Sequence, residues 1–414
     1  MRSLWHLVAI TALALTAASA SAAPKGAKTP VSGSADLYPR IINCYAAGVW
    51  KGTPEAELRN IARYDLLCGG MGEDATAELA RLRQLNPNVR LLPYVILRET
   101  DDKDATVKEE WWARDTHGKR FSFWPTTSVV NLLLPEVQDW LVKRCAALLS
   151  DPTRFDGIFL DGYDQSIGYL NHDSPNDIDL DRDGKRDDPQ TRDAQWRAAE
   201  ESVIHRIGAL RGGKVLLMAN TWSFPEWVPK GLLHGVLAED QIGQIRKGAI
   251  TLDRFVEDYL KTEADSRKPA TIGVVNGGSE LDIRQYLALT KEEKDAEQRK
   301  VRADTQRMRF GLCATLMGDG CYGYDLGPIR GQHWWYPEYS KIGRPTGPAV
   351  HLAPNVWARA FVDSQKRRTL VLANGSKQSV SVRELTNAAK GLGWTAATGA
   401  RVAPLDGVLL KGGS

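Results

Sequence analysis

The chain has 414 residues, of which 54 are Lys or Arg and 51 are Asp or Glu, so its formal net charge is only +3. Such a balanced charge gives no electrostatic footprint for nucleic acid, and we expect no nucleic-acid partner. The length exceeds that of one ordinary core and can hold a barrel of about 250 residues together with a smaller module.

Residues 1–22 have the layout of a secretory signal peptide. Arg2 precedes an apolar run from Leu7 to Leu15, and small residues follow it, with Ala-x-Ala cleavage sites after Ala20 and Ala22. The apolar run is too short to span a bilayer permanently. We therefore expect a secreted or periplasmic protein without a stable membrane anchor, and a retained anchor is the less favoured alternative.

The first half of the mature chain alternates between short apolar runs and helical patterns. Strands are expected at 40–46, 64–70, 89–97 and 155–161, and helices at 54–64, 75–85 and 135–149. Two long excursions interrupt this alternation, at 98–130 and 165–191, and the first is rich in aromatic residues. Loops of this length are usually functional or disordered, and disordered segments are poor in aromatics.

The alternation continues in the second half and completes a set of eight strands. We expect a helix at 193–210, strands at 214–220, 235–241 and 270–278, a helix at 302–317 and a last strand at 319–327. Eight strands separated mostly by helices predict an α/β fold, a (β/α)8 TIM barrel over 38–350. The short alternating runs at WARAFV, RTLVLAN, SVSVREL and VLLKGG predict a small C-terminal antiparallel β module over 351–414.

Five cysteines are spread widely, and an odd number leaves at least one thiol unpaired within a monomer. Cys44 and Cys68 lie in strand-like apolar segments, where a free cysteine behaves as a small hydrophobic residue. We expect buried thiols. Of the possible disulfides, Cys313–Cys321 is the least implausible.

The run FDGIFLDGYD (155–164) is the most informative segment. Its apolar residues have no helical period and read as a buried parallel strand that ends at Asp161. Glu239 ends the sixth expected strand in the same way, after GVLA. Active sites of barrels lie at the carboxyl ends of the strands, so two acids there predict the carboxylate pair that cleaves glycosidic bonds. A salt bridge or a cap is the alternative for either acid alone.

Other residues at strand ends and on the loops after the strands are candidates for substrate binding. Aromatic rings stack on the apolar faces of sugars, and polar groups bind the hydroxyls. For any single ring, packing against the barrel is the more frequent role. The expected substrate-binding residues are Tyr45, Tyr94, Trp124, Asp164, Asn220, Trp222, Asn276, Asp325, Trp334 and Trp335.

The segment DIDLDRDGKRDD (177–188) carries the D-x-D-x-D-G spacing of a calcium loop. The expected metal ligands are Asp179, Asp181, Asp183, Lys185 and Asp187. Gln190 occupies the position at which such a loop usually supplies a bidentate glutamate. The loop therefore resembles one-sided calcium loops more than the paired loops of EF-hands. We expect a structural calcium ion and no organic cofactor. A solvated acidic turn is the alternative.

The chain resembles glycoside hydrolases with barrel folds, in particular glycosyl hydrolase-like family 15, and more distantly endo-α-1,4-polygalactosaminidases. The resemblance rests on FDGIFLDGYD, NLLLPEVQDWL (131–141), AED (238–240) and WWYPEYSKIGRP (334–345). It implies a sugar hydrolase with Asp161 and Glu239 as the matched acids, and it does not indicate a substrate.

The sequence therefore predicts a secreted glycoside hydrolase that acts on a polysaccharide or glycoconjugate. Glu239 is expected as general acid/base and Asp161 as nucleophile or stabiliser of the oxocarbenium-like state, although the two roles could be exchanged. The alternative is a catalytically inactive carbohydrate-binding or surface-assembly protein on a barrel scaffold. A polysaccharide lyase or a deacetylase is a third option; seven histidines without metal-like spacing weaken the deacetylase.

Overall fold

The computed structural model describes residues 37–412 except 73, 125 and 390–400. The signal peptide expected over residues 1–22 lies outside these described residues. Within the described ranges, no helix is both long and apolar enough to cross a membrane.

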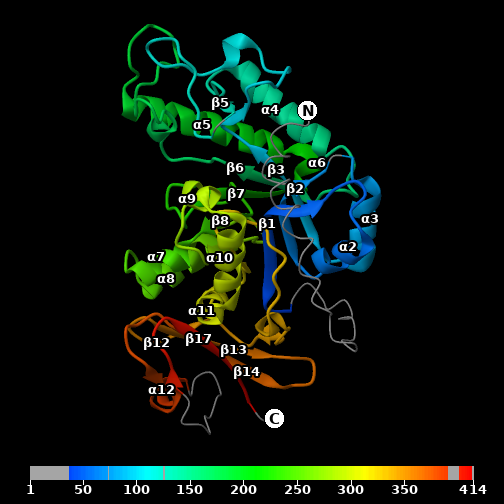
Figure 1. Cartoon of the computed structure of the whole chain (residues 1–414), viewed down its shortest axis with the longest axis vertical. Coiled ribbons are helices and arrows are strands. Elements are labelled where there is room, and N and C mark those ends of the chain that lie inside the picture. Colours follow the sequence, from blue (N-terminus) through cyan, green and yellow to red (C-terminus); the bar gives the residue numbers. More distant parts are fainter. Residues whose placement is uncertain (1–36, 73, 125, 390–400, 413–414) are drawn as a thin grey trace. The chain divides into compact units, whose positions relative to one another are not determined.

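In the part of the chain that the structure describes, eight parallel strands form a closed barrel in the order β1-β10-β9-β8-β7-β6-β3-β2. The expected (β/α)8 fold is thereby confirmed (Figure 1). The barrel strands are β1 (Arg40–Val49), β2 (Leu66–Met71), β3 (Arg90–Ile96), β6 (Gly157–Asp161), β7 (Leu216–Trp222), β8 (Gly235–Glu239), β9 (Gly273–Gly277) and β10 (Cys321–Asp325).

Helices connect these strands. They are α2 (Glu55–Ile61), α3 (Thr76–Leu85), α4 (Pro135–Leu148), α5 (Pro189–Gly208), α6 (Leu210–Gly213), α7 (Gln241–Lys247), α8 (Leu252–Asp265), α9 (Ile283–Ala288), α10 (Lys291–Ala303) and α11 (Thr305–Thr315). The sequence analysis placed no helices between its sixth and seventh strands or directly after the seventh, so α7 to α10 were missed.

By its internal contacts the chain divides into two compact units. The first holds Leu91–Thr221 and Trp227–Leu233, and the second holds the described residues up to Arg90, Trp222–Glu226, and those from His234 onward.

The barrel strands are made of residues that tolerate complete burial. Every residue of β6, β8, β9 and β10 is buried, as expected for parallel strands covered on both faces. Gly157 begins β6 opposite Leu216 of β7, and a Cβ on it would lie 1.8 Å from the Leu216 carbonyl oxygen. Close approach of the two backbones therefore requires glycine here. Asp156 precedes β6 and accepts the Leu91 amide at 2.8 Å, which is a structural contact.

The two long excursions of the first unit are ordered and tied to each other. In the first, β4 (Glu99–Asp101) pairs antiparallel with β5 (Thr127–Val129), and a 3-10 turn covers Glu109–Trp111. The second contains a 3-10 turn at Gly168–Leu170. The Asp179 amide donates to the Arg114 carbonyl at 2.9 Å, and Asn131 Nδ2 donates to the Leu180 carbonyl at 2.8 Å. The first contact joins the two excursions, and the second joins the later excursion to the residue directly after the earlier one.

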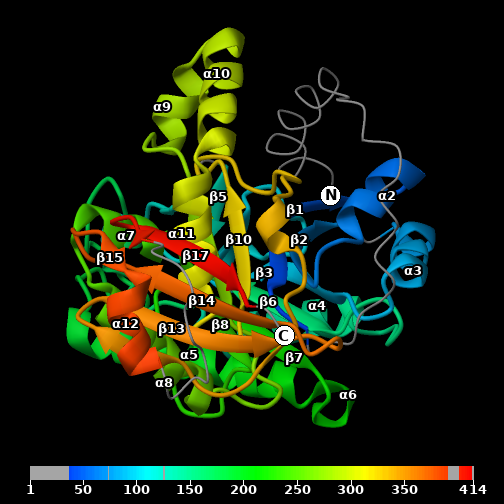
Figure 2. The same cartoon turned by 90° about the horizontal axis from the view of Figure 1, so that it is seen from below.

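The C-terminal β module is confirmed as an antiparallel sheet of β11 (Arg344–Pro345), β12 (Val350–Ala353), β13 (Val356–Val362), β14 (Arg368–Asn374) and β17 (Asp406–Lys411). Figure 2 shows β14 and β17 close to α11. Arg309 of α11 pairs with Asp406 of β17 through two contacts, 3.0 and 2.7 Å long.

The prediction of a strand at SVSVREL is largely wrong. In SVSVREL (379–385), only β15 (Val380–Ser381) is a strand; it pairs with β16 (Arg401–Val402), and α12 (Val382–Ala389) begins directly after it. The valine alternation is also satisfied at a strand-to-helix junction, because Val382 is buried in the core of the module and Val380 packs against that core.

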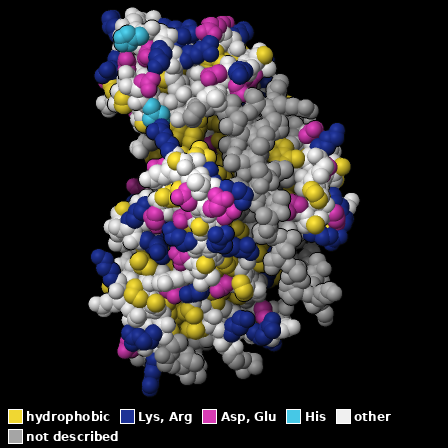
Figure 3. Space-filling model, viewed as in Figure 1, with side chains coloured by type: hydrophobic (Ala, Val, Ile, Leu, Met, Phe, Trp, Pro, Cys, Tyr) yellow, Lys and Arg dark blue, Asp and Glu magenta, His cyan; other side chains and the backbone are white. Residues whose placement is uncertain are grey.

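All five cysteines are buried free thiols, as expected, but the Cys313–Cys321 disulfide is not formed. Cys313 lies on α11 and Cys321 begins β10. On the face drawn in Figure 3, basic and acidic side chains intermingle, in line with the balanced composition.

Candidate active site

Asp161 is held by hydrogen bonds from the two strands that flank β6. Tyr94 of β3 donates its hydroxyl to Oδ2 at 2.5 Å, and Asn220 of β7 donates Nδ2 to Oδ1 at 3.0 Å. Both carboxylate oxygens therefore accept a bond from a neutral donor, which fixes the plane of the carboxylate. Burial, and next the negative charge of Asp161, raise the pKa of Tyr94 well above its usual value. All three residues were expected as site residues.

A second layer of charges lies behind Asp161 in the same unit. Arg98 Nη1 lies 2.5 Å from Asp164 Oδ2, and its Nε lies 3.6 Å from Glu99 Oε1. Gly162 makes room for this arginine, because its φ is +71° and a Cβ on it would lie 2.7 Å from Arg98 Nη1. Burial raises the pKa of Asp164, and the charge of Arg98 opposes that rise.

Glu200 extends this layer into α5 and is fully buried. Its Oε1 accepts the Asp164 amide at 3.4 Å, while Oε2 has no hydrogen-bond partner. Burial, followed by the charge of Asp164, raises the pKa of Glu200 well above its usual value. Neither Arg98, on the loop after β3, nor Glu200, within helix α5, was predicted as a site residue.

Aromatic rings of the first unit gather around Phe123. Trp124 and Tyr169 meet it edge-on at ring distances of 5.0 and 5.5 Å, and His172 stacks on it at 5.1 Å. Trp124 and Tyr169 are 41% and 37% exposed, so they present apolar area to solvent. Trp124 was an expected substrate-binding residue and Tyr169 was not. The neighbouring Trp112 is buried.

In the second unit, Glu239 lies at the end of β8 and contacts an arginine. Arg330 Nε lies 3.1 Å from Glu239 Oε1, and the same guanidinium contacts Asp325, which ends β10, and Asp240. Burial raises the pKa of Asp325 to about 7, against the opposing charge of Arg330. Asp325 was expected at the site. Arg330 was missed, since it follows β10 on a loop without a recognisable pattern.

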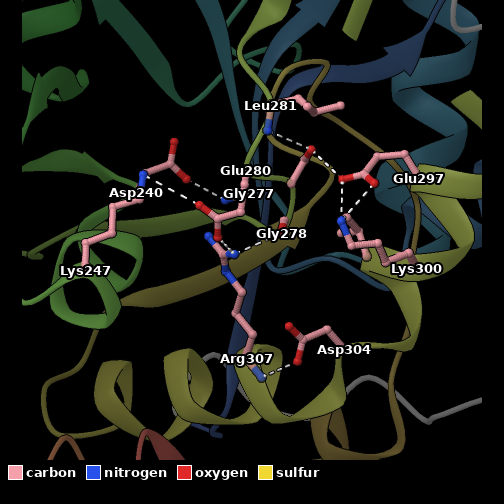
Figure 4. A network of polar contacts seen from close by, with 12 residues as sticks. Asp240, Lys247, Gly277, Gly278, Glu280, Leu281, Glu297, Lys300, Asp304 and Arg307 are labelled. Atoms are coloured by element: carbon pink, nitrogen blue, oxygen red, sulfur yellow. Dashed lines mark hydrogen bonds and ion pairs between the residues drawn. The ribbon is translucent and has the colours of Figure 1, made fainter. Parts of the chain in front are cut away.

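Asp240 is fixed by β9. Its amide donates to the Val275 carbonyl at 2.8 Å, and its Oδ1 accepts the Gly277 amide at 2.5 Å (Figure 4). Nearby, Arg307 of α11 donates to the Gly278 carbonyl at 2.9 Å and pairs with Glu280. These contacts hold the carboxyl end of β9 to the adjoining helices.

Three residues within or directly after barrel strands have left-handed backbones although they are not glycine. The φ angles are +67° for Tyr45, +63° for Trp222 and +52° for Asp240. Such conformations cost energy for residues with a Cβ, and they concentrate at functional sites. Trp222 is also 46% exposed, and its carbonyl accepts Gln241 Nε2 at 2.8 Å. Tyr45 and Trp222 were expected as substrate-binding residues.

The remaining expected residues have protein contacts of their own. Asn276 is buried, and its Oδ1 accepts the Ile242 amide at 3.2 Å. Trp334 is buried 6.3 Å from the Tyr324 ring and lines a small cavity beside Asp325. Trp335 lies under the Arg63 guanidinium at 4.0 Å. These rings therefore pack against the protein.

The acidic loop brings some of its expected ligands together. Ligand oxygens of Asp179, Asp181 and Asp187 lie within 4.8 Å of one another. Burial raises the pKa of Asp187, and the charges of Asp181 and Asp179 add to the rise. Asp183 instead accepts the Lys185 amide at 2.7 Å, with the Lys185 ammonium 3.3 Å away.

A family model described as hypothetical glycosyl hydrolase family 15 matches residues 78–365 of the chain. No curated protein matches it. The matches among solved structures are remote, with identities of 15% or less in the three named here.

A variant of the GH36 α-galactosidase AgaA from Geobacillus stearothermophilus matches with a TM-score of 0.46 and 10% identity over 82% of this chain and 47% of the other. The glycoside hydrolase domain of PelA from Pseudomonas aeruginosa matches at 0.42 and 15% over 74% and 98%. The noncanonic maltogenic α-amylase AmyB from Thermotoga neapolitana matches at 0.44 and 11% over 90% and 96%. The chain spans about half the length of the α-galactosidase.

Proposed function

The chain belongs to hypothetical glycosyl hydrolase family 15, and on this basis we propose that it is a secreted glycoside hydrolase that cleaves a polysaccharide or glycoconjugate with Asp161 and Glu239. The strands of a parallel barrel run in one direction, and active sites form at their carboxyl ends. Asp161 ends β6 and Glu239 ends β8.

The observation that carries the proposal is the pair of donors on Asp161. Tyr94 and Asn220 occupy both carboxylate oxygens, so Asp161 is oriented. An oriented carboxylate suits the nucleophile, or the stabiliser of an oxocarbenium-like transition state. Glu239 is then the general acid/base, which protonates the leaving oxygen and afterwards takes a proton from water.

Substitution tests the pair directly. Asp161→Asn and Glu239→Gln should each lower the rate on the identified substrate by several orders of magnitude, because each removes one of two acids that act together. The thermal midpoint should stay within a few degrees of the wild type. Activity is measured on a panel of glycans, with reducing ends as the readout.

Glu136→Gln is the matched control, since Glu136 lies exposed in the first turn of α4. It should keep wild-type activity. Near-full activity of either acid variant would remove that residue from the mechanism. A wild type that binds glycans and hydrolyses none would favour the carbohydrate-binding alternative.

We further propose that the loop over 177–188 binds a structural calcium ion. Three carboxylates converge there, and the mutual repulsion of Asp179, Asp181 and Asp187 would be relieved by a hard cation with a preference for oxygen ligands. Asp179 and Asp181 fit the spacing of such a loop, and Asp183 would have to turn from Lys185 to join them. The ion would stabilise the second excursion.

Calcium titration tests this second proposal. Extracellular sites of this kind have dissociation constants of roughly 10⁻⁴–10⁻³ M, so ~10 mM calcium over a ~10⁻⁴ M site should add about 2.7 kcal/mol to stability. The metal-stripped protein should show heat of binding in calorimetry and a higher thermal midpoint with calcium. Asp181→Ala should abolish both effects. Asp173→Ala, which removes an exposed acid paired with Lys119, should not. The absence of binding heat would leave the loop a solvated acidic turn.

A further inference from the structure

Arg330 lies between three carboxylates of the second unit and gives each of them a different nitrogen. Its Nε lies 3.1 Å from Glu239 Oε1, its Nη1 3.0 Å from Asp325 Oδ1 and its Nη2 2.7 Å from Asp240 Oδ2. The arginine side chain is 12% exposed. A guanidinium is planar and rigid, so contacts at all three nitrogens fix its orientation.

Two of the three acids are themselves anchored to the barrel. Asp240 is held by the Val275 carbonyl and the Gly277 amide of β9 (Figure 4). Asp325 ends β10 and accepts the Gly331 amide on Oδ2 at 3.3 Å. The anchored acids therefore hold the arginine, and the arginine in turn holds the Glu239 carboxylate.

The charges around Glu239 oppose one another. Arg330 favours its anion, and Asp325 and Asp240 favour its protonated form. The buried thiol of Cys44 is another titratable group near Glu239, and the Tyr45 phenol is one near Arg330. The single guanidinium of Arg330 contacts all three carboxylates. Proton uptake by each carboxylate therefore depends on how strongly the other two interact with the same positive charge. Burial raises the pKa of Asp325 to about 7 even with Arg330 in contact.

We propose that Arg330 is a positioning residue that orients the Glu239 carboxylate and lowers the pH at which it exchanges its proton. This inference rests on the proposed acid/base role of Glu239. A general acid/base gives up and regains a proton in each cycle, so it must titrate near the working pH. Burial beside two other acids would raise the pH at which Glu239 loses its proton, and Arg330 opposes that rise.

Direct titration tests the inference without any substrate. The protein is labelled with ¹³C at the glutamate carboxyl carbons, and Glu239→Gln identifies the Glu239 signal by its loss. In Arg330→Met, the Glu239 signal should titrate at higher pH than in the wild type, by roughly one to three pH units, the usual effect of one opposite charge in contact. An unchanged titration in a folded Arg330→Met protein overturns the proposal.

Two further variants give shifts of known sign. Asp240→Asn removes a negative charge that competes for Arg330, while its side-chain oxygen can still accept the Gly277 amide, so the Glu239 titration should move to lower pH. An unmoved signal would contradict the shared-cation arrangement. This isosteric change also decides the matter if Arg330→Met does not fold. Lys247→Met removes an exposed positive charge that pairs with Glu280 and should leave the Glu239 signal in place.

Activity then separates this inference from the proposed function. With an active wild type, Arg330→Met should shift the basic limb of kcat/KM to higher pH and lower kcat about 10–100-fold, whereas a purely structural arginine would lower the thermal midpoint and leave the limb in place. With an inactive wild type, the proposed function fails, and the NMR titration still decides whether Arg330 controls Glu239.

Discussion

The acids at and behind the strand ends differ in the groups that surround them. Asp161 accepts bonds from two neutral donors, Tyr94 and Asn220. Glu200 is fully buried beside Asp164 with one oxygen unpartnered, so burial favours its neutral form. Donors on both oxygens surround the Asp161 carboxylate, whereas burial favours the neutral form of Glu200.

Glu200→Gln should keep the fold and reduce the loss of stability at high pH. The pKa of Glu200 is raised in the folded protein, so between about pH 4.5 and that raised value the folded chain holds a proton that the unfolded chain has released. Stability of the wild type then falls as pH rises through this window. The amide does not titrate, so the variant should lose less stability between pH 5 and pH 8 in urea unfolding.

Glu292→Gln, an exposed change on α10, should leave the pH dependence of the wild type intact. A Glu200→Gln protein that loses several kcal/mol at pH 5 would contradict the interpretation, because it would mean that the ionised carboxylate stabilises the fold.

The sequence could predict those site residues that lie on a recognisable strand. Asp161, Tyr94 and Asn220 were found because each belongs to a recognisable apolar run, and the barrel brings their strands side by side. Arg98, Glu200 and Arg330 were not found. Their contacts depend on loop paths and on the rotation of α5, which local patterns do not encode.

Helix α5 carries the buried side chains of Glu200 and Trp196, so its position determines where both side chains lie. Its start is specified by two local signals. Asp188 accepts the Thr191 amide at 2.9 Å, and Pro189 occupies the first turn, where its missing N–H costs nothing.

Asp188→Ala should therefore destabilise the protein, because α5 loses the acceptor at its N-cap. Asp188→Asn keeps an acceptor at the cap and should lose less. Urea unfolding of both variants beside the wild type measures the difference, and equal losses would show that the cap bond contributes nothing.

The helices that the sequence analysis missed divide into two kinds. In α8, Leu252, Phe255, Val256 and Tyr259 are buried at helical spacing, so the pattern was available and was overlooked. In α10, Val301 is the buried residue and the rest is mostly charged, so there was little apolar period to detect. Its capping box at Thr290 and Glu293 was the better signal.

Across the second unit, the C-terminal sheet and α11 meet with little free space. A Cβ on Gly407 of β17 would lie 2.5 Å from both Cβ and Sγ of Cys313 and 2.9 Å from the Arg309 carbonyl. Arg359 of β13 reaches the Gly318 carbonyl at 2.6 Å. The module thus depends on contacts that a small change in volume would disturb.

Gly407→Ala should destabilise the protein by roughly 1–3 kcal/mol, the usual cost of overpacking a filled site. Gly347→Ala is the matched control, since nothing lies within 4 Å of a Cβ there and its backbone is ordinary. Thermal unfolding should separate the two variants clearly. If they melt together, the sheet is not held tightly to α11.

The fold as a whole was predictable because eight apolar runs of strand length recur between helices, and a barrel is the arrangement that buries them all. The division of the chain into two compact units was not predictable. It follows from the density of contacts between distant segments, such as α11 and β17, and leaves no trace in local composition.

The left-handed backbones of Tyr45, Trp222 and Asp240 have a consequence for engineering. A search for thermostable variants would favour glycine at these positions, since glycine adopts such angles without a steric penalty. Each exchange would also delete the side chain that the turn presents. A variant that gains heat resistance in this way should have a lower kcat. These three residues should therefore be left unchanged when the protein is engineered for stability.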